Sequence, residues 1–196
     1  MEKYKYKKFN RKFIGITFLS LKESRKTILL TGATGYLGSN LLKQLLQEGA
    51  FELVVLKRSF SNTFRIQDYL KNVIMYDVDL TKLEDIFQKH RFDLIIHCAT
   101  DYGRKNTPVL QTIEANLALP LRLLELGKQY GAQCFINTDT ILDKRINAYS
   151  LSKNQIEEWL RVASSHEPWP AIGKELPRSG RSGKTKRERA QAPRGD

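Results

Sequence analysis

The stretch ILLTGATGYLGS, residues 28–39, places three glycines directly after a short apolar run. Such a run, followed by a glycine-rich turn and a helix, is typical of a phosphate-binding unit, because side chains must be absent where a pyrophosphate approaches the backbone. We expect Gly32 to make the turn, Gly35 to face the ligand and Gly38 to let the helix lie close to the strand. The alternative is a purely structural turn.

The helix predicted after this turn reads YLGSNLLKQLLQEG and ends at Gly49. Its N-terminus, which carries a partial positive charge, would point at the glycine turn. One face of the helix is apolar and is expected to pack on the sheet. This stripe comprises Leu37, Leu41, Leu42, Leu45 and Leu46. Thr34, Tyr36 and Leu37 join the three glycines as predicted cofactor-binding residues.

Apolar runs alternate with amphipathic stretches after residue 27, five of each. The pattern predicts an α/β protein with an NAD(P)-binding Rossmann fold, a parallel sheet of order 3-2-1-4-5 and helices on both faces. The expected strands lie near 28–32, 52–58, 72–80, 93–100 and 132–140, and the helices near 36–49, 64–70, 83–90, 109–130 and 148–163. We divide the chain into a basic N-terminal extension (1–26), the Rossmann domain (27–166) and a disordered basic tail (167–196).

The net charge of +12 is concentrated at the two ends of the 196-residue chain. Residues 1–27 carry +7 and residues 173–196 carry +5, so residues 28–172 are neutral. A neutral centre predicts no specific nucleic-acid partner, although the tails could attract polyanions through salt-sensitive contacts. Residues 13–21 form a short apolar run. We interpret it as part of a loosely packed extension in preference to a secretory signal or a membrane-surface segment. We also predict no membrane span and expect a cytoplasmic protein.

The two cysteines, Cys98 and Cys134, each lie at the end of an apolar run. This placement favours small buried side chains in a reducing compartment over a disulfide framework. The sequence has no zinc-ligand spacing, so we predict no metal site.

A second constellation combines Thr140, at the end of the fifth predicted strand, with Tyr149 and Lys153. Residues four apart share a helix face, so the Lys153 ammonium is expected to lie near the Tyr149 phenol and to lower its pKa. A tyrosine with such a pKa can transfer protons near neutral pH, and the Thr140 hydroxyl could hold the substrate oxygen. The alternative is a Tyr/Lys pair that only decorates a helix surface.

The motifs TGATGYLGS, DVDL, DLIIHCAT, FINTDT and YSLSK, with Asn116, together resemble the NAD-dependent epimerase/dehydratase family of extended short-chain dehydrogenases, which act on nucleotide-activated sugars. The resemblance covers residues 27 to about 165. Within the family, IIHCATDYGRK and residues 113–140 look most like the CDP-abequose synthase group, which reduces a CDP-4-keto-6-deoxyhexose.

The resemblance implies a role for each matching residue. The three glycines, Gly32, Gly35 and Gly38, would contact the pyrophosphate. Asp79 and Leu80 would contact the adenine, and Ala99 and Thr100 would line the nicotinamide side. Thr140, Tyr149 and Lys153 would form the catalytic triad, and Lys153 would also bind the nicotinamide ribose. The alternative for Asp79 is a strand-end cap. We interpret His97 as a core histidine outside the site.

Asn116 is a further candidate, because Pro120 has no amide proton to donate to the carbonyl of residue 116. The family places an asparagine in this helix near the active-site lysine, where a water can relay protons. The freed carbonyl would be the anchor of that water; the alternative is a kink that fits the helix to the sheet.

The residues after the second strand bear on the cofactor. NAD-specific members of the family carry an acid there, whereas this chain has Lys57 and Arg58. Two cations would pair with a 2′-phosphate, so we predict NADP(H) in preference to NAD(H), and therefore reduction of a sugar ketone. The alternative is an ordinary solvated loop.

The chain also departs from the family pattern. Extended members continue for over a hundred further residues, so the resemblance implies a C-terminally truncated chain without its substrate domain. Whether such a chain is an active enzyme stays open. Three functions remain: a nucleotide-sugar reductase, a non-catalytic dinucleotide-binding module, or a tail-driven polyanion binder. The oligomeric state also stays open, although relatives often form a homodimer through two long helices, which here would be residues 107–129 and 147–164.

Overall fold

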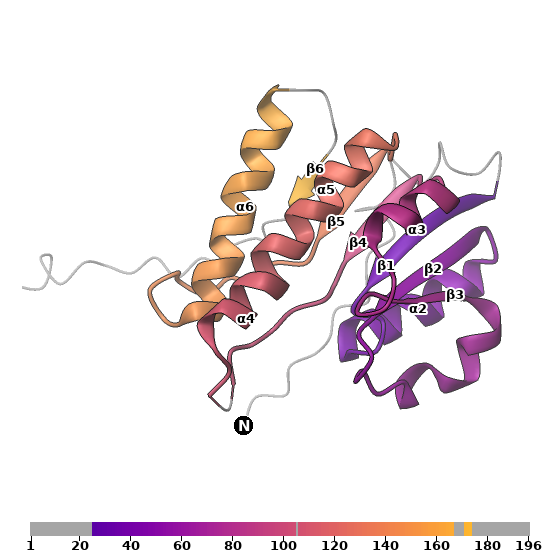
Figure 1. Cartoon of the computed structure of the whole chain (residues 1–196), viewed down its shortest axis with the longest axis horizontal. Coiled ribbons are helices and arrows are strands. Elements are labelled where there is room, and N and C mark those ends of the chain that lie inside the picture. Colours follow the sequence, from indigo (N-terminus) through magenta and orange to yellow (C-terminus); the bar gives the residue numbers. More distant parts are fainter. Residues whose placement is uncertain (1–24, 105, 167–170, 174–196) are drawn as a thin grey trace, which may run out of the picture.

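The computed structural model describes residues 25–104, 106–166 and 171–173, which fold around one parallel sheet (Figure 1). The strand order is β3-β2-β1-β4-β5-β6, which confirms the predicted order of the first five strands. Their bounds are β1 Lys26–Thr31, β2 Phe51–Lys57, β3 Ile74–Asp77, β4 Leu94–His97, β5 Cys134–Asn137 and β6 Ala171–Gly173. Each strand pairs in parallel with its neighbours, an arrangement that requires crossover connections between the strands.

The sixth strand corrects our expectation that regular structure ends at residue 166. Residues 171–173 pair with β5 from Phe135 to Asn137 and extend the sheet by one strand. Three residues between a proline-containing segment and a basic one carry too little periodicity to predict a strand, and the open edge of β5 supplies the missing signal. The other residues of the predicted tail, and the N-terminal extension up to residue 24, lie outside the described residues.

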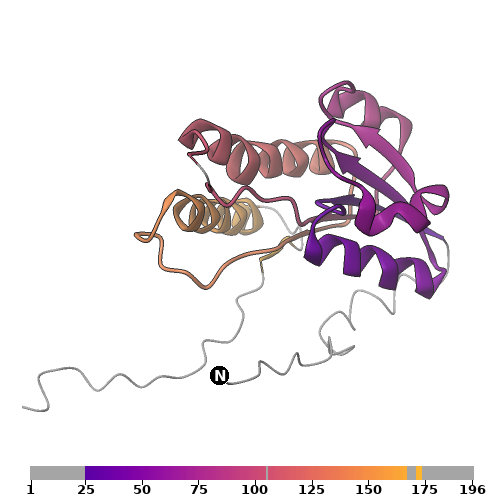
Figure 2. The same ribbon diagram turned by 90° about the horizontal axis from the view of Figure 1, so that it is seen from below.

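Helices cover both faces of the sheet, as predicted. Helix α2 and the 3₁₀ helix η2 pack on one face, and α3, α5 and α6 pack on the other. In Figure 2, α2 runs in indigo along the lower side of the described part. The bounds are α2 Tyr36–Glu48, η2 Phe64–Asn72, α3 Leu83–Lys89, α4 Val109–Ile113, η3 Glu114–Ala118, α5 Leu119–Gln129 and α6 Ala148–His166.

The predicted helix near 109–130 is one continuous rod with a π-helical segment, η3, between α4 and α5. The N–H of Leu119 donates to the carbonyl of Glu114, five residues back. This wider turn lies directly before Pro120, which has no N–H to donate. Helix α6 lies beside α4 and η3 (Figure 1), and it carries Tyr149 and Lys153, which line the groove described below.

The strand register aligns the residues that will form the site. Thr31 pairs with His97 and His97 with Asn137, so the ends of β1, β4 and β5 lie at one level. Lys57 pairs with Asp77 at the ends of β2 and β3. In a parallel sheet this carboxyl edge is where ligands bind.

Candidate functional site

A groove of about 1090 Å³ runs along the carboxyl edge of the sheet. It begins beside Lys57 and Arg58, passes the glycine turn, and ends beside Tyr149 and Lys153. Every residue predicted to bind the cofactor lines it, whereas Thr140 and Asn116 do not. Pockets for small molecules and cofactors usually measure roughly 300–1,000 Å³, so this groove is large enough for an extended ligand.

Two of the three glycines are required by close backbone contacts. A Cβ at Gly32, whose φ is +71°, would lie 2.5 Å from the backbone nitrogen of Ala99. A Cβ at Gly38 would lie 2.6 Å from the carbonyl carbon of Gly32, so a side chain there would push α2 off the strand. Gly35 differs, because its nearest contact would be the Gly32 oxygen at 3.3 Å, and it is exposed at the groove.

The N-terminus of α2 opens into the groove without a side-chain cap. Gly35 is the N-cap residue, and the first turn contains no acidic side chain. First-turn N–H groups and the helix dipole therefore remain available to an anion. Tyr36 and Leu37 flank this opening. Leu37 is half exposed and lines the groove, so it does not belong to the buried apolar face of α2; of the five leucines predicted for that face, Leu42 and Leu45 are buried.

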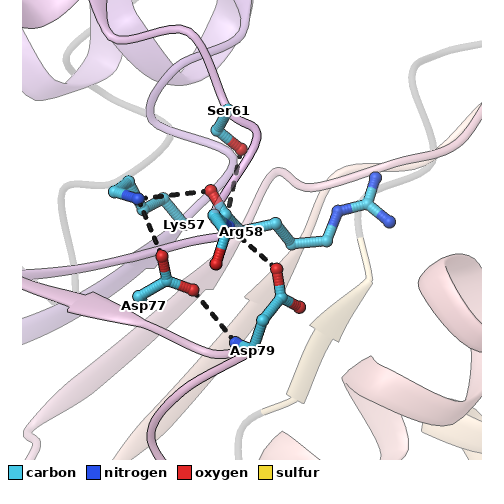
Figure 3. Close-up of polar contacts among 6 residues, drawn as sticks. Lys57, Arg58, Ser61, Asp77 and Asp79 are labelled. Atoms are coloured by element: carbon cyan, nitrogen blue, oxygen red, sulfur yellow. Dashed lines mark hydrogen bonds and ion pairs between the residues drawn. The ribbon is translucent and has the colours of Figure 1, made fainter.

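On the other side of the glycine turn, the charge of Lys57 is neutralised by the carboxylate of Asp77, at the end of the neighbouring strand β3. Its Nζ lies 3.0 Å from Asp77 Oδ2 and also donates to the carbonyl of Arg58 (Figure 3). This pair corrects the expectation that two cations are available to a 2′-phosphate. The guanidinium of Arg58 extends away from the pair and lies 4.4 Å from the Phe60 ring centroid. Arg58 has no acidic partner among the described residues.

Asp79 behaves as the strand-end cap that we weighed as its alternative role. Its carboxylate accepts the N–H of Ser59 at 2.8 Å, and its own N–H donates to Asp77 (Figure 3). Leu80 beside it is 82% exposed and lines the groove, so an apolar surface is present for a planar ring.

Beneath the groove, the ends of β1 and β4 are joined by a buried polar contact. Thr31 Oγ1 accepts the N–H of Ala99 at 3.2 Å and lies 2.9 Å from His97 Nδ1. The Thr31 oxygen accepts a hydrogen bond from the N–H of Ala99, and its hydroxyl proton can be donated to His97 Nδ1. The His97 ring is fully buried, as expected for a core histidine, and burial lowers its pKa to about 3. Its Nε2 has no partner among the described residues.

Tyr149 lies at the far end of the groove, where three neighbours act on it. Burial raises the pKa of Tyr149, a hydrogen bond with Thr140 acts in the opposite direction, and Tyr102 and Asp139 raise it further. The ring centroids of Tyr102 and Tyr149 are 4.9 Å apart. The raised pKa corrects our expectation that Lys153 lowers it: burial dominates, and the ammonium is not among the groups that shift Tyr149.

Lys153 is the most unusual residue of the groove. It is 1% exposed, and its Nζ has no hydrogen-bond partner among the described residues. Burial lowers its pKa, while Asp139 and Cys98 act in the opposite direction. A buried ammonium without a partner is costly, so a polar group brought by a ligand would stabilise it.

Asn116 is fully buried and joins a loop to α6 through four hydrogen bonds. Its Oδ1 accepts from Thr100 Oγ1 (3.0 Å) and the N–H of Asp101 (2.7 Å). Its Nδ2 donates to the Asp101 carbonyl (2.8 Å) and to Ser152 Oγ (3.0 Å), and Ser152 in turn donates to the Tyr149 carbonyl. The side chain is therefore a clamp behind the groove, not a group that faces it.

The structure adds groove residues that we did not predict, notably Thr138, Asp139, Tyr102 and Arg104. Thr138 lies nearer the groove than Thr140 and donates to the His97 carbonyl. Burial raises the pKa of Asp139, and the Thr140 N–H and Lys153 act in the opposite direction. The sequence NTDT at the end of β5 could have indicated Thr138 and Asp139 as site residues, because the residues directly after a strand lie closest to the carboxyl edge of the sheet.

These features fit a dinucleotide. The backbone contacts at Gly32 and Gly38 form a cradle that a Cβ would fill, and Lys153, whose Nζ has no partner among the described residues, lies at one end of the same groove. A metal is not suggested, since the described residues contain no group of three or more His, Cys, Asp or Glu that could hold one. Over the same residues no helix is long and apolar enough to cross a membrane.

Comparison with known proteins places these residues in a family. The model described as "NAD dependent epimerase/dehydratase family" matches residues 28–173. The chain is 33% identical over 150 residues to CDP-abequose synthase of Salmonella muenchen, covering 73% of this chain and 49% of that protein. It is 32% identical over 175 residues to UDP-glucose 4-epimerase 2 of Arabidopsis thaliana, covering 75% and 50%.

Solved structures agree with the fold. The UDP-Glc/GlcNAc 4-epimerase of Campylobacter jejuni superposes with a TM-score of 0.64 at 27% identity, covering 74% of this chain and 51% of that one. The UDP-glucuronic acid 4-epimerase of Bacillus cereus, solved in complex with NAD, gives a TM-score of 0.64 at 22% identity, covering 74% and 54%. The chain thus spans about half the length of the relatives it matches.

Proposed function

Because the chain belongs to the NAD dependent epimerase/dehydratase family, we propose that its groove binds NADP(H) and serves the reduction of a 4-keto-6-deoxy sugar nucleotide. One observation carries the proposal: a single groove holds a glycine cradle at its middle and the Tyr149–Lys153 pair at its end. When bound, the dinucleotide supplies the hydride. The similarity to CDP-abequose synthase supports a nucleotide-activated sugar as the substrate.

The residues of the chain supply the proton and the orientation. Tyr149 donates its phenolic proton to the oxygen of the sugar ketone, and the Thr140 hydroxyl, which is hydrogen-bonded to Tyr149, orients the phenol. A raised pKa keeps Tyr149 protonated at neutral pH, which suits a proton donor in reduction. Lys153, whose buried Nζ has no hydrogen-bond partner among the described residues, binds the nicotinamide ribose.

The preference for NADP(H) is supported by the end of β2. That position carries Lys57 and Arg58 in place of an acid, and Arg58 has no acidic partner among the residues described. A guanidinium can bind a phosphate through two hydrogen bonds, whereas an acid there would repel it. NADPH in turn favours reduction over the redox-neutral epimerase reaction. A cytoplasmic location and a homodimer belong to the same proposal.

Titration tests the cofactor, and one substitution tests the chemistry. The purified chain should bind NADPH and NADP⁺ more tightly than NADH and NAD⁺, as measured by calorimetry. Absence of binding at millimolar ligand would refute the whole proposal and leave the tails as the functional part. Binding without turnover of a keto-sugar nucleotide would favour the non-catalytic module.

Where turnover is present, Tyr149→Phe should reduce it by roughly a hundredfold or more while NADPH affinity stays within about twofold. The matched control is Tyr69→Phe, because Tyr69 lies on η2 and does not line the groove. Equal rates for Tyr149→Phe and the wild type would contradict the role of the phenol.

A further inference from the structure

A guanidinium without an acidic partner among the described residues lies near the Tyr149 end of the groove. It belongs to Arg104, in the loop between β4 and α4, which lines the groove together with Tyr102. We infer that Arg104 is a specificity-determining residue, which binds the diphosphate group of a nucleotide-activated sugar while the sugar ketone lies at Tyr149. This inference rests on the proposed function.

Arg104 and Tyr149 are linked through the ring of Tyr102. The ring centroids of Tyr149 and Tyr102 are 4.9 Å apart, and Cζ of Arg104 lies 4.9 Å from the Tyr102 centroid. Because both groups adjoin the same ring, the guanidinium is no farther from the Tyr149 ring than these two separations together. That span is comparable with the length of a hexose and its first phosphate. In a 4-keto sugar nucleotide the diphosphate is attached across the ring from the ketone, so one ligand can contact both residues.

The guanidinium of Arg104 is available to an anion. With the residues that the structure describes it forms no ion pair and no side-chain hydrogen bond, and it lies over the Tyr102 ring. The nearest carboxylate along the chain, that of Asp101, accepts the N–H of Gly103 at 2.7 Å and the side-chain amide of Gln111 at 3.3 Å. A cation on an aromatic face keeps its N–H groups free at the edges, so Arg104 can donate two hydrogen bonds to a phosphate.

The backbone that carries Arg104 is anchored by hydrogen bonds. The N–H of Asp101 donates to Asn116 Oδ1 at 2.7 Å, and Asn116 Nδ2 donates to the Asp101 carbonyl at 2.8 Å. Gly103 then turns the chain with a φ of +62°, and the Arg104 carbonyl accepts the N–H of Thr107 at 3.2 Å. These contacts hold Arg104 beside the groove, so the cost of ordering a loop does not oppose binding of the anion.

Charge and position identify the ligand. A guanidinium suits a pair of phosphate oxygens and would gain little from the neutral hydroxyls of a sugar. In the proposed function the pyrophosphate of the cofactor lies at the glycine turn and the N-terminus of α2, so a second diphosphate in the groove comes from the substrate. Its binding at Arg104 would orient the ketone toward Tyr149, because the binding energy of a remote group positions the reacting atoms.

The experiment measures binding of a nucleoside diphosphate while the cofactor site is filled. With NADP⁺ saturating, we would titrate the wild type, Arg104→Leu and Arg104→Lys with CDP, UDP and cytidine by calorimetry, and each protein separately with NADPH. Arg104→Leu should weaken CDP and UDP by about tenfold while NADPH stays within about twofold, and Arg104→Lys should recover part of the loss. The matched control is Arg122→Leu, because Arg122 also lines the groove but pairs with Glu84 at 3.5 Å. This control should leave every affinity within about twofold.

Unchanged CDP affinity in Arg104→Leu would overturn the inference, as would a wild type that binds cytidine as tightly as CDP. Equal loss of NADPH and CDP affinity would overturn it too, because Arg104 would then serve the pyrophosphate of the cofactor. Circular dichroism checks that each variant is folded, which is expected because Arg104 is exposed. A wild type that binds neither NADPH nor NADP⁺ refutes the proposed function, whereas one that binds NADPH but not CDP refutes only the diphosphate site.

Discussion

Acidification should destabilise this protein through one buried side chain, His97. The ring is fully buried, and burial, followed by the charge of Lys153, lowers its pKa from the usual 6.5 to about 3. Between these values the unfolded chain binds a proton that the folded protein does not, so the free energy of unfolding falls as the pH falls. Going from about pH 7.5 to about pH 5 should therefore cost about 2 kcal/mol from this group alone.

Urea denaturation at both pH values tests this, with His97→Gln as the variant. Glutamine does not titrate, so the variant should lose about 2 kcal/mol less than the wild type on acidification. It should also be less stable at neutral pH, because the contact between Thr31 and His97 is altered. A His90→Gln control keeps His97 and should retain the wild-type loss. The reasoning fails if His97→Gln loses as much stability as the wild type.

Two further substitutions test the positioning of the groove by urea denaturation. Gly38→Ala should destabilise the fold by about 1–3 kcal/mol, because the new Cβ would lie 2.6 Å from the Gly32 carbonyl carbon and 2.9 Å from Ala33 Cα. This overlap outweighs the higher helix propensity of alanine. An unchanged urea midpoint would contradict the close packing. Asn116→Ala should cost on the order of 2–3 kcal/mol, because it removes the four hydrogen bonds of the buried amide and leaves the N–H and the carbonyl of Asp101 without their partner. Wild-type stability in that variant would show that the clamp is dispensable.

Local sequence was sufficient for the parts of the fold that repeat simple patterns. Apolar runs of strand length alternate with amphipathic stretches, so the order of the first five strands and the helices on both faces could be predicted. The helix after the glycine turn ends where predicted, since Gly49 adopts a left-handed φ of +68° that favours glycine. Strand β6 could not be found in this way, because it depends on the free edge of β5.

The same division applies to the groove. Gly32 and Gly38 are readable from sequence because their requirement is local: a turn, and the helix that follows it. The electrostatic roles were harder, because a charge is defined by its partners. Lys57 and Asp77 are 20 residues apart, and only the pairing of β2 with β3 brings them together.

By itself, then, the sequence determined the parallel α/β architecture, the glycine cradle and the helix that carries both Tyr149 and Lys153, since each depends on spacing along the chain. The tertiary structure decided which cations pair with a carboxylate, which side chains are buried, and which backbone groups accept a hydrogen bond from Asn116. Burial raises the pKa of Tyr149, lowers that of His97 and leaves Lys153 without a hydrogen-bond partner among the described residues. These properties arise from contacts between segments far apart in sequence, so no local pattern records them.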